Sequence, residues 1–281
     1  MKFSKIKSFA KINLTIKVLG KYKNGFHKIE SLVSKISLSD EILIKEINSF
    51  KNKINFTGKF SKSIPESNTV SKLLNLLVDQ NYIKNKKFQI IIKKNIPQFS
   101  GMGGGSMNAG SVLNYFIKKK IIKVSKNELI KIAQSIGSDV ILGLFNGPVI
   151  VFGKKKFKLL KKKIKFHLLI IKPSFGCSTK TIYSHHRGLT KGMFINKPIF
   201  KKDYLRNNLN NDLEITAFKK YPILQKIKNF MQKLDNIYFV NMTGTGSTII
   251  GYFLTKNAAL KAKKKLENKY KNYWCIYSKT I

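Results

Sequence analysis

The sequence IPQFSGMGGGSMNAGSVL, residues 96–113, contains four glycines within five positions, Gly101 and Gly103–Gly105. An alternating apolar run, residues 88–92, precedes this stretch, and an apolar run with helical spacing, residues 112–116, follows it. The glycines therefore join a predicted strand directly to a predicted helix. In that position successive backbone N–H groups point into one concavity at a helix N-terminus, which binds anions and phosphates above all. Glycine has no Cβ, so an oxyanion can approach the backbone closely.

Other interpretations of the glycine loop fit less well. A flexible linker would be polar on both sides, and a Walker A loop needs Lys-Ser or Lys-Thr after its last glycine. A dinucleotide fingerprint would carry a third glycine where Ser106 stands, and it would lie in the first βαβ unit. A purely structural turn stays open as an alternative, although four glycines in five residues cost chain entropy.

The first half of the chain alternates between strand and helix patterns. Residues 10–18 alternate between apolar and polar, which predicts a half-buried strand, and an Asn24-Gly25 turn follows. Apolar side chains at positions 70, 73, 74 and 77 predict one buried face of a helix that begins near Ser67.

A second helix is predicted by the pair Ser125 and Glu128, which forms a capping box, and Gly137 is expected to end it. The apolar stretch 148–153 then closes this half as a strand.

A different order of elements begins near residue 165. A strand leads to helical segments between about 178 and 234, interrupted near Pro222, and then to a pair of strands with a glycine-rich tip, a helix and a last strand. The order β-α-β-β-α-β suggests a ferredoxin-like domain. We therefore expect two domains, residues 1–155 and 156–281.

The net charge of +42 is the most conspicuous number in the composition. Only Arg187 and Arg206 are arginines, so lysine supplies 53 of the 55 basic residues. Bidentate reading of bases and phosphates usually relies on arginine. The lysines are also scattered through every segment, which favours the codon bias of an A/T-rich genome over a nucleic-acid function.

The remaining composition indicates a cytoplasmic protein. Cys177 and Cys275 fit no metal spacing and no disulfide framework, so we expect thiols in a reducing compartment. Lys11, Asn13 and Lys17 interrupt the first apolar stretch, which excludes a signal-peptide core. No later apolar segment is long enough to span a bilayer.

The glycine loop resembles the P-x-x-x-G-L-G-x-x-S phosphate loop of the GHMP family of small-molecule kinases. Further similarity runs along the whole chain, in FAKINLTIKVLGKYKNGFHKIES near the start, IGSDVILGLFNGPVIVFG in the middle, NNDLE at 210–214 and MTGTGS near the end. The resemblance implies an α+β, two-domain fold, with a first domain like the second domain of ribosomal protein S5 and a ferredoxin-like second domain.

The resemblance also implies an activity. The triple glycine and the NGFH turn match those family members that transfer a phosphoryl group from ATP, with Mg²⁺, to the 2-hydroxyl of 4-diphosphocytidyl-2-C-methyl-D-erythritol, a step of the non-mevalonate route to isoprenoid precursors. The expected partner is this small molecule, with no specific nucleic acid and no membrane, and the expected assembly is a monomer or a homodimer. The alternatives are a kinase for another small alcohol, of the homoserine or mevalonate type, and a basic nucleic-acid-binding protein on a degenerate kinase fold.

The resemblance assigns roles to individual residues. Lys11 is expected to stabilise the transferred phosphoryl group, and Asp139 to accept or orient the proton of the attacking hydroxyl. The predicted ATP-binding residues are Pro97, Gly101, Gly103, Gly104, Gly105, Ser106 and Asn108. The predicted substrate-binding residues are Asn13, Phe26, His27, Tyr183, Thr243, Gly244 and Gly246, with Phe26 and Tyr183 stacked on the two faces of the cytosine.

Simpler interpretations of these residues remain. Lys11 could lie on a solvated face, Asp139 could cap a helix, and Phe26 and Tyr183 could belong to the core. The TGTGS stretch, residues 243–247, could be only a hairpin turn.

Three residues depart from the family pattern. Met102 replaces a Leu, and Met107 replaces a Ser, which we expect to remove one hydroxyl from the phosphate neighbourhood. Ile141 stands where a Pro often follows Asp-Val, so the loop beside Asp139 is expected to be looser.

Overall fold

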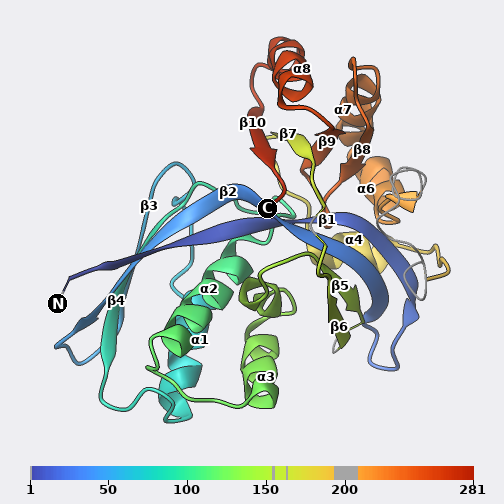
Figure 1. Cartoon of the computed structure of the whole chain (residues 1–281). Coiled ribbons are helices and arrows are strands. Elements are labelled where there is room, and N and C mark those ends of the chain that lie inside the picture. The colour runs from blue at the N-terminus through green and yellow to red at the C-terminus, as the bar shows by residue number, and fades with distance from the viewer. Residues whose placement is uncertain (1, 154–155, 163, 193–207) are drawn as a thin grey trace. The chain divides into compact units, whose positions relative to one another are not determined.

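The computed structural model describes residues 2–153, 156–162, 164–192 and 208–281 (Figure 1). The chain forms two compact units, of which the first comprises residues 1–11, 38–98 and 103–146 and the second residues 12–37, 99–102 and 147–281. Two long strands, β1 (Ser4–Lys21) and β2 (His27–Ile47), pass through both units. Residue 155, the predicted end of the first domain, lies outside the described residues, and a division there stays a prediction.

The first unit combines paired strands with three helices (Figure 1). Strand β4 (Lys87–Lys93) pairs in parallel with β3 (Lys53–Thr57) and antiparallel with residues 41–47 of β2. Helix α1 (Thr69–Asp79) packs beside α2 (Gly104–Lys118) and α3 (Lys126–Ile136). A short 3₁₀ helix, η1 (Val140–Leu144), packs on α2. The glycine loop thus leads from β4 into α2, as the sequence predicts.

The predicted helix signals are largely confirmed. The buried face of α1 consists of the four apolar residues at positions 70, 73, 74 and 77, and Asn68, one residue after the predicted start, caps the helix. Ser125 and Glu128 form the capping box of α3, and Gly137 is its C-cap residue. Because α3 ends at that glycine, the chain turns into η1 immediately after Asp139.

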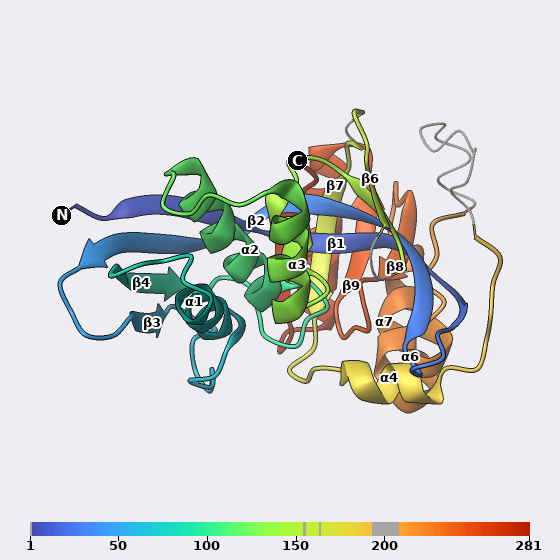
Figure 2. The same cartoon turned by 90° about the horizontal axis from the view of Figure 1, so that it is seen from below.

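The second unit contains the predicted β-α-β-β-α-β order. It runs β7 (His167–Lys172), α4 (Thr179–His185), α6 (Glu214–Lys220), α7 (Pro222–Gln232), β8 (Phe239–Met242), β9 (Ile249–Phe253), α8 (Lys256–Lys269) and β10 (Trp274–Lys279). The strands form an antiparallel sheet in the order β10-β7-β9-β8, of which β7, β8 and β9 are labelled in Figure 2. This order is the ferredoxin-like topology that the sequence suggests. A further antiparallel pair, β5 (Val149–Phe152) and β6 (Lys156–Leu159), joins residues 30–33 of β2.

Apolar faces of the helices form the core of the second unit. Leu224, Ile227 and Met231 of α7 are fully buried in one cluster with residues of β7, β8 and β9. Pro222 begins α7, where its missing N–H costs no helical hydrogen bond. Cys177 belongs to this cluster, and burial raises the pKa of its thiol to about 11. No helix among the described residues combines the length and the apolar character needed to cross a membrane.

Candidate functional site

Lys11 and Asp139 form an ion pair in the first unit, with 3.1 Å between the ammonium nitrogen and a carboxylate oxygen. The Lys11 side chain on β1 is 5% exposed and that of Asp139 is 38% exposed. Lys11 therefore does not lie on a solvated face. Asp139 occupies the N-cap position of η1, but its side chain makes no capping hydrogen bond, so the helix-cap interpretation is also wrong. The carboxylate stays available to a ligand beside a buried cation.

The glycine loop contacts the same lysine. Gly103, the residue before α2, has φ +69°, a left-handed conformation that glycine adopts without strain. A Cβ on Gly103 would lie 2.9 Å from Cε of Lys11. The first N–H groups of α2 have no partner within the helix, so the loop offers backbone donors beside the Lys11 ammonium. This arrangement suits the phosphates of a nucleotide.

A buried ion pair lies beside the loop, and no sequence pattern reveals it. Lys94 is 3% exposed, and its ammonium lies 3.4 Å from the position that a Cβ on Gly104 would take. It donates to Asp40, which is fully buried and also accepts the N–H groups of Asn95 and Ile96 at 2.7 and 2.9 Å. Asp40 therefore fixes the chain between β4 and the loop. No sequence signal marks Lys94 among 53 lysines.

The remaining residues of the loop differ in burial. Met107 is fully buried in the first unit, and the expected loss of a hydroxyl from the phosphate neighbourhood stays a prediction. Asn108 is 2% exposed, and its buried Oδ1 has no hydrogen-bond partner among the described residues. Pro97 is buried, whereas Gly105 is exposed and Ser106 is partly exposed.

Four predicted residues of the second unit meet at the hairpin between β8 and β9. The backbone N–H of Asn13 donates to the hydroxyl of Thr243 at 2.9 Å. Gly101 has φ +73°, and a Cβ on it would lie 2.2 Å from the carbonyl oxygen of Thr243. A Cβ on Gly244 would in turn lie 3.0 Å from the carbonyl oxygen of Gly101. The TGTGS stretch is thus a hairpin turn that also folds against Gly101, the first glycine of the loop. Its role in substrate binding stays a prediction.

Two of the predicted base-binding residues, His27 and Tyr183, lie together in the second unit. The rings of His27 and Tyr183 lie 5.1 Å apart at 36°. The Nε2 atom of His27 is buried and has no hydrogen-bond partner in the described structure. Burial lowers the pKa of His27, and the charges of Lys21 and His186 lower it further.

Phe26 and Tyr183 differ in exposure. Phe26 is 61% exposed, so the core interpretation is wrong for this residue. Tyr183 is partly buried against the core cluster of the second unit. Stacking of both rings on one cytosine stays a prediction.

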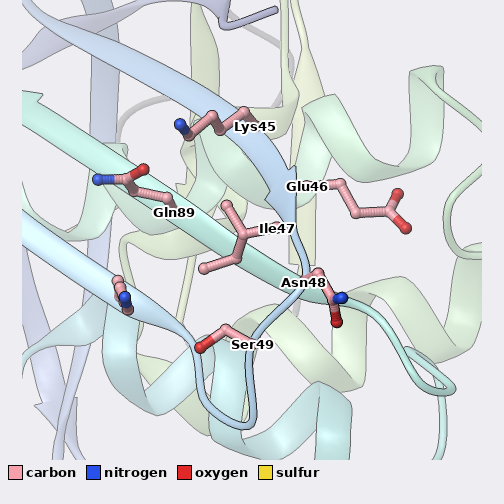
Figure 3. A pocket seen from close by; sticks show the side chains of 7 residues that line it. Lys45, Glu46, Ile47, Asn48, Ser49 and Gln89 are labelled. Atoms are coloured by element: carbon pink, nitrogen blue, oxygen red, sulfur yellow. The ribbon is translucent and has the colours of Figure 1, made fainter. Parts of the chain in front are cut away.

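A hollow of about 400 Å³ lies in the first unit, at the end of β2 and the turn toward β3 (Figure 3). Polar side chains line it, among them Lys45 and Gln89, which pair across β2 and β4. None of the predicted catalytic or ligand-binding residues lines this hollow.

Comparisons with known proteins show which family the chain resembles. The model of the GHMP kinases N terminal domain matches residues 68–154, and that of the GHMP kinases C terminal domain matches residues 200–272. A 4-diphosphocytidyl-2-C-methyl-D-erythritol kinase of Pelagibacter ubique is 52% identical over 99% of both chains. The kinase of the same name from Clostridioides difficile is 34% identical over 99% of this chain and 96% of its own.

Solved structures share the fold. The crystal structure of a 4-(cytidine 5'-diphospho)-2C-methyl-D-erythritol kinase matches with a TM-score of 0.81 at 22% identity, over 99% of this chain and all of the other. A homoserine kinase from Cytophaga hutchinsonii matches with a TM-score of 0.70 at 17% identity, over 100% of this chain and 97% of its own. The two family models and the relatives that match over nearly the whole chain thus show that the chain belongs to the GHMP kinase family.

Proposed function

We propose that the chain transfers the γ-phosphoryl group of ATP to the 2-hydroxyl of 4-diphosphocytidyl-2-C-methyl-D-erythritol. The Lys11–Asp139 pair beside the glycine loop is the observation that carries the reaction type. The identity of 52% with a kinase of that name, over nearly the full length of both chains, supports the substrate. Such a kinase would serve the non-mevalonate route to isoprenoid precursors, and we place it in the cytoplasm.

Residues of the first unit would perform the transfer. The N–H groups at the start of α2 would hold the ATP phosphates, and Lys11 would neutralise charge that develops on the transferred group. The Asp139 carboxylate would orient the acceptor hydroxyl and take its proton, because it is partly exposed and held by a buried ammonium. The Lys11 ammonium keeps the carboxylate in place between turnovers.

Mg²⁺ would enter with the nucleotide. No cluster of three or more His, Cys, Asp or Glu side chains gathers in the part of the chain that the structure describes. Mg²⁺ usually binds through substrate phosphates and one or two protein oxygens, and it would neutralise phosphate charge there. The Ser106 hydroxyl and one oxygen of the Asp139 carboxylate would be protein oxygens of this kind.

Residues of the second unit would recognise the cytidine end of the substrate. The His27 imidazole has a buried Nε2 that lacks a partner among the described residues, and it could bond to the edge of the pyrimidine. Tyr183 and Phe26 would offer aromatic faces to the ring. Thr243, Gly244 and Gly246 would line the diphosphate.

Product analysis tests the proposal. Phosphorus NMR of the product made from ATP and the cytidine compound should show a new phosphomonoester on the 2-hydroxyl, with the diphosphate unchanged. A phosphate on another hydroxyl, or inorganic phosphate as the sole product, would contradict the assignment.

A further inference from the structure

The departure at Ile141 raises the question of what fixes the loop that carries Asp139. A family proline would stiffen this loop, but here the chain after Asp139 forms η1 without one. Asp139 itself has φ −91° and ψ −7°, and its carbonyl accepts the N–H of Leu142 at 3.1 Å. A single short turn of this kind does not hold a carboxylate in place alone, so the support must come from a neighbouring element.

Helix α2 supplies that support through two glycines in contact. A Cβ on Gly110 of α2 would lie 2.4 Å from the carbonyl oxygen of Val140, the residue after Asp139, and 2.9 Å from Cα of Gly143. A Cβ on Gly143 would lie 2.7 Å from Cα of Gly110. All these neighbours are backbone atoms, so no side-chain rotation could make room for a methyl group.

The same helix also contacts Lys11. Gly103, directly before α2, packs against the Lys11 side chain, and Gly110 packs against the peptide that follows Asp139. Seven residues of a rigid helical segment separate the two contacts, a rise of roughly 10 Å. One helix therefore positions both partners of the 3.1 Å ion pair.

We propose that the Gly110–Gly143 contact is a positioning element that sets the place of Asp139 relative to Lys11 and the phosphate loop. This inference rests on the proposed kinase function, because its consequence is the rate of phosphoryl transfer. Gly110 and Gly143 touch no substrate in this account and act through Asp139.

The test compares three Gly→Ala variants in the full chain. Gly110→Ala and Gly143→Ala should each lower kcat by about tenfold to a hundredfold, since a misplacement of about 1 Å can cost 10²-fold. The affinity for ATP should stay near that of the parent, because the loop N–H groups lie at the start of α2, away from the Gly110–Gly143 contact. The kcat of the double variant should be no lower than that of the less active single variant, because both substitutions disturb one contact.

Gly137→Ala is the matched control on the other side of Asp139. Its φ of 171° is extended, and its Cβ would lie 3.6 Å from the nearest atom, a Val140 methyl group, so kcat should not change. Ala also favours a helix interior more than Gly does, so a loss in Gly110→Ala cannot come from a weaker helix.

The kcat of each variant is measured with whichever acceptor the parent phosphorylates. The thermal midpoint and the affinity for ATP are measured on the same preparations. If the parent phosphorylates another alcohol but not the cytidine compound, this result would contradict the proposed function but not this inference. A folded Gly110→Ala variant with the kcat of the parent would overturn the inference. So would an equal loss in Gly137→Ala, a parallel loss of ATP affinity, or failure of both contact variants to fold.

Discussion

The ammonium of Lys11 lies 3.1 Å from a carboxylate oxygen of Asp139, and the two side chains differ in exposure, 5% against 38%. The buried cation holds the acid in place, while the acid keeps one side open to a ligand. An exposed ion pair contributes little to stability, since its charges are hydrated and screened. A pair with one buried partner beside the glycine loop is compatible with the catalytic roles that we propose for Lys11 and Asp139.

Asp139→Asn should abolish turnover while ATP binding stays nearly intact. The amide keeps the shape but cannot accept the proton, and positioned general-base catalysis is typically worth about 10²–10⁴-fold. Turnover and ATP affinity are measured on the same preparation. Asp235→Asn is the matched control, because Asp235 pairs with Lys265 with 74% of its side chain exposed. An Asp139→Asn rate within a fewfold of the parent would remove this residue from the mechanism.

Gly104→Val should raise the KM for ATP sharply. A Cβ at this position would already lie 3.1 Å from Cγ2 of Ile96 and 3.4 Å from the Lys94 ammonium, so a branched side chain must displace the start of α2. The KM for the second substrate is the internal control and should change little. Unchanged nucleotide affinity in a folded variant would show that the loop is structural.

Phe26→Ala and Tyr183→Ala should each weaken binding of the cytidine substrate and spare ATP. Loss of one stacked face costs about 1–3 kcal/mol, or roughly 5- to 150-fold in affinity. Phe26→Tyr should be nearly neutral, because the ring is kept. Tyr183→Ala should also erode discrimination between cytidine and uridine analogues, since Tyr183 packs on His27. Phe50→Ala, at a fully exposed ring, is the control. Parent-like affinity in Phe26→Ala would exclude this ring from the base site.

Substrate affinity should keep its neutral-pH value as the pH falls past 6.5. Burial, then Lys21 and His186, lower the pKa of His27 from 6.5, so its imidazole stays neutral further into acid. Affinity should fall only below that lowered pKa, and His27→Gln should remove this acidic limb. An affinity that already falls at pH 6.5 in the parent would contradict the role of a neutral His27.

The same shift predicts how stability depends on pH. Between the lowered pKa and 6.5 the unfolded chain binds a proton at His27 that the folded chain does not, so stability falls as the pH falls through this window. Above pH 6.5 both states are neutral at His27, and no effect is expected. Thermal midpoints of the parent and of His27→Gln across this range measure the difference, and identical acid slopes in the two proteins would contradict the prediction.

Local patterns predicted much of the fold. The alternation in β1, the capping box at Ser125 and the glycine that ends α3 are each encoded within a few residues, so one sequence suffices to recognise them. The position of Asp139 just after that glycine follows from the same signals. The roles of Lys11 and Asp139 needed the resemblance, because one lysine among 53 carries no signal of its own.

The missed features depend on pairing across long separations. Lys94 and Asp40 meet because β4 pairs with β2. Neither residue type nor local spacing in the sequence reveals this pairing. Gly110 and Gly143 meet because η1 packs on α2, and each glycine alone is unremarkable in sequence. Met107 is buried because the helical turn of α2 directs its side chain into the core, which its place after the triple glycine does not reveal.

The most direct test of the central claim is a coupled ADP-release assay that offers 4-diphosphocytidyl-2-C-methyl-D-erythritol, homoserine and mevalonate separately to the purified full chain with ATP and Mg²⁺. The account predicts stoichiometric ADP release with the cytidine compound and only background release with the other two. A higher kcat/KM for homoserine or mevalonate, or no release above background with the cytidine compound, would contradict it.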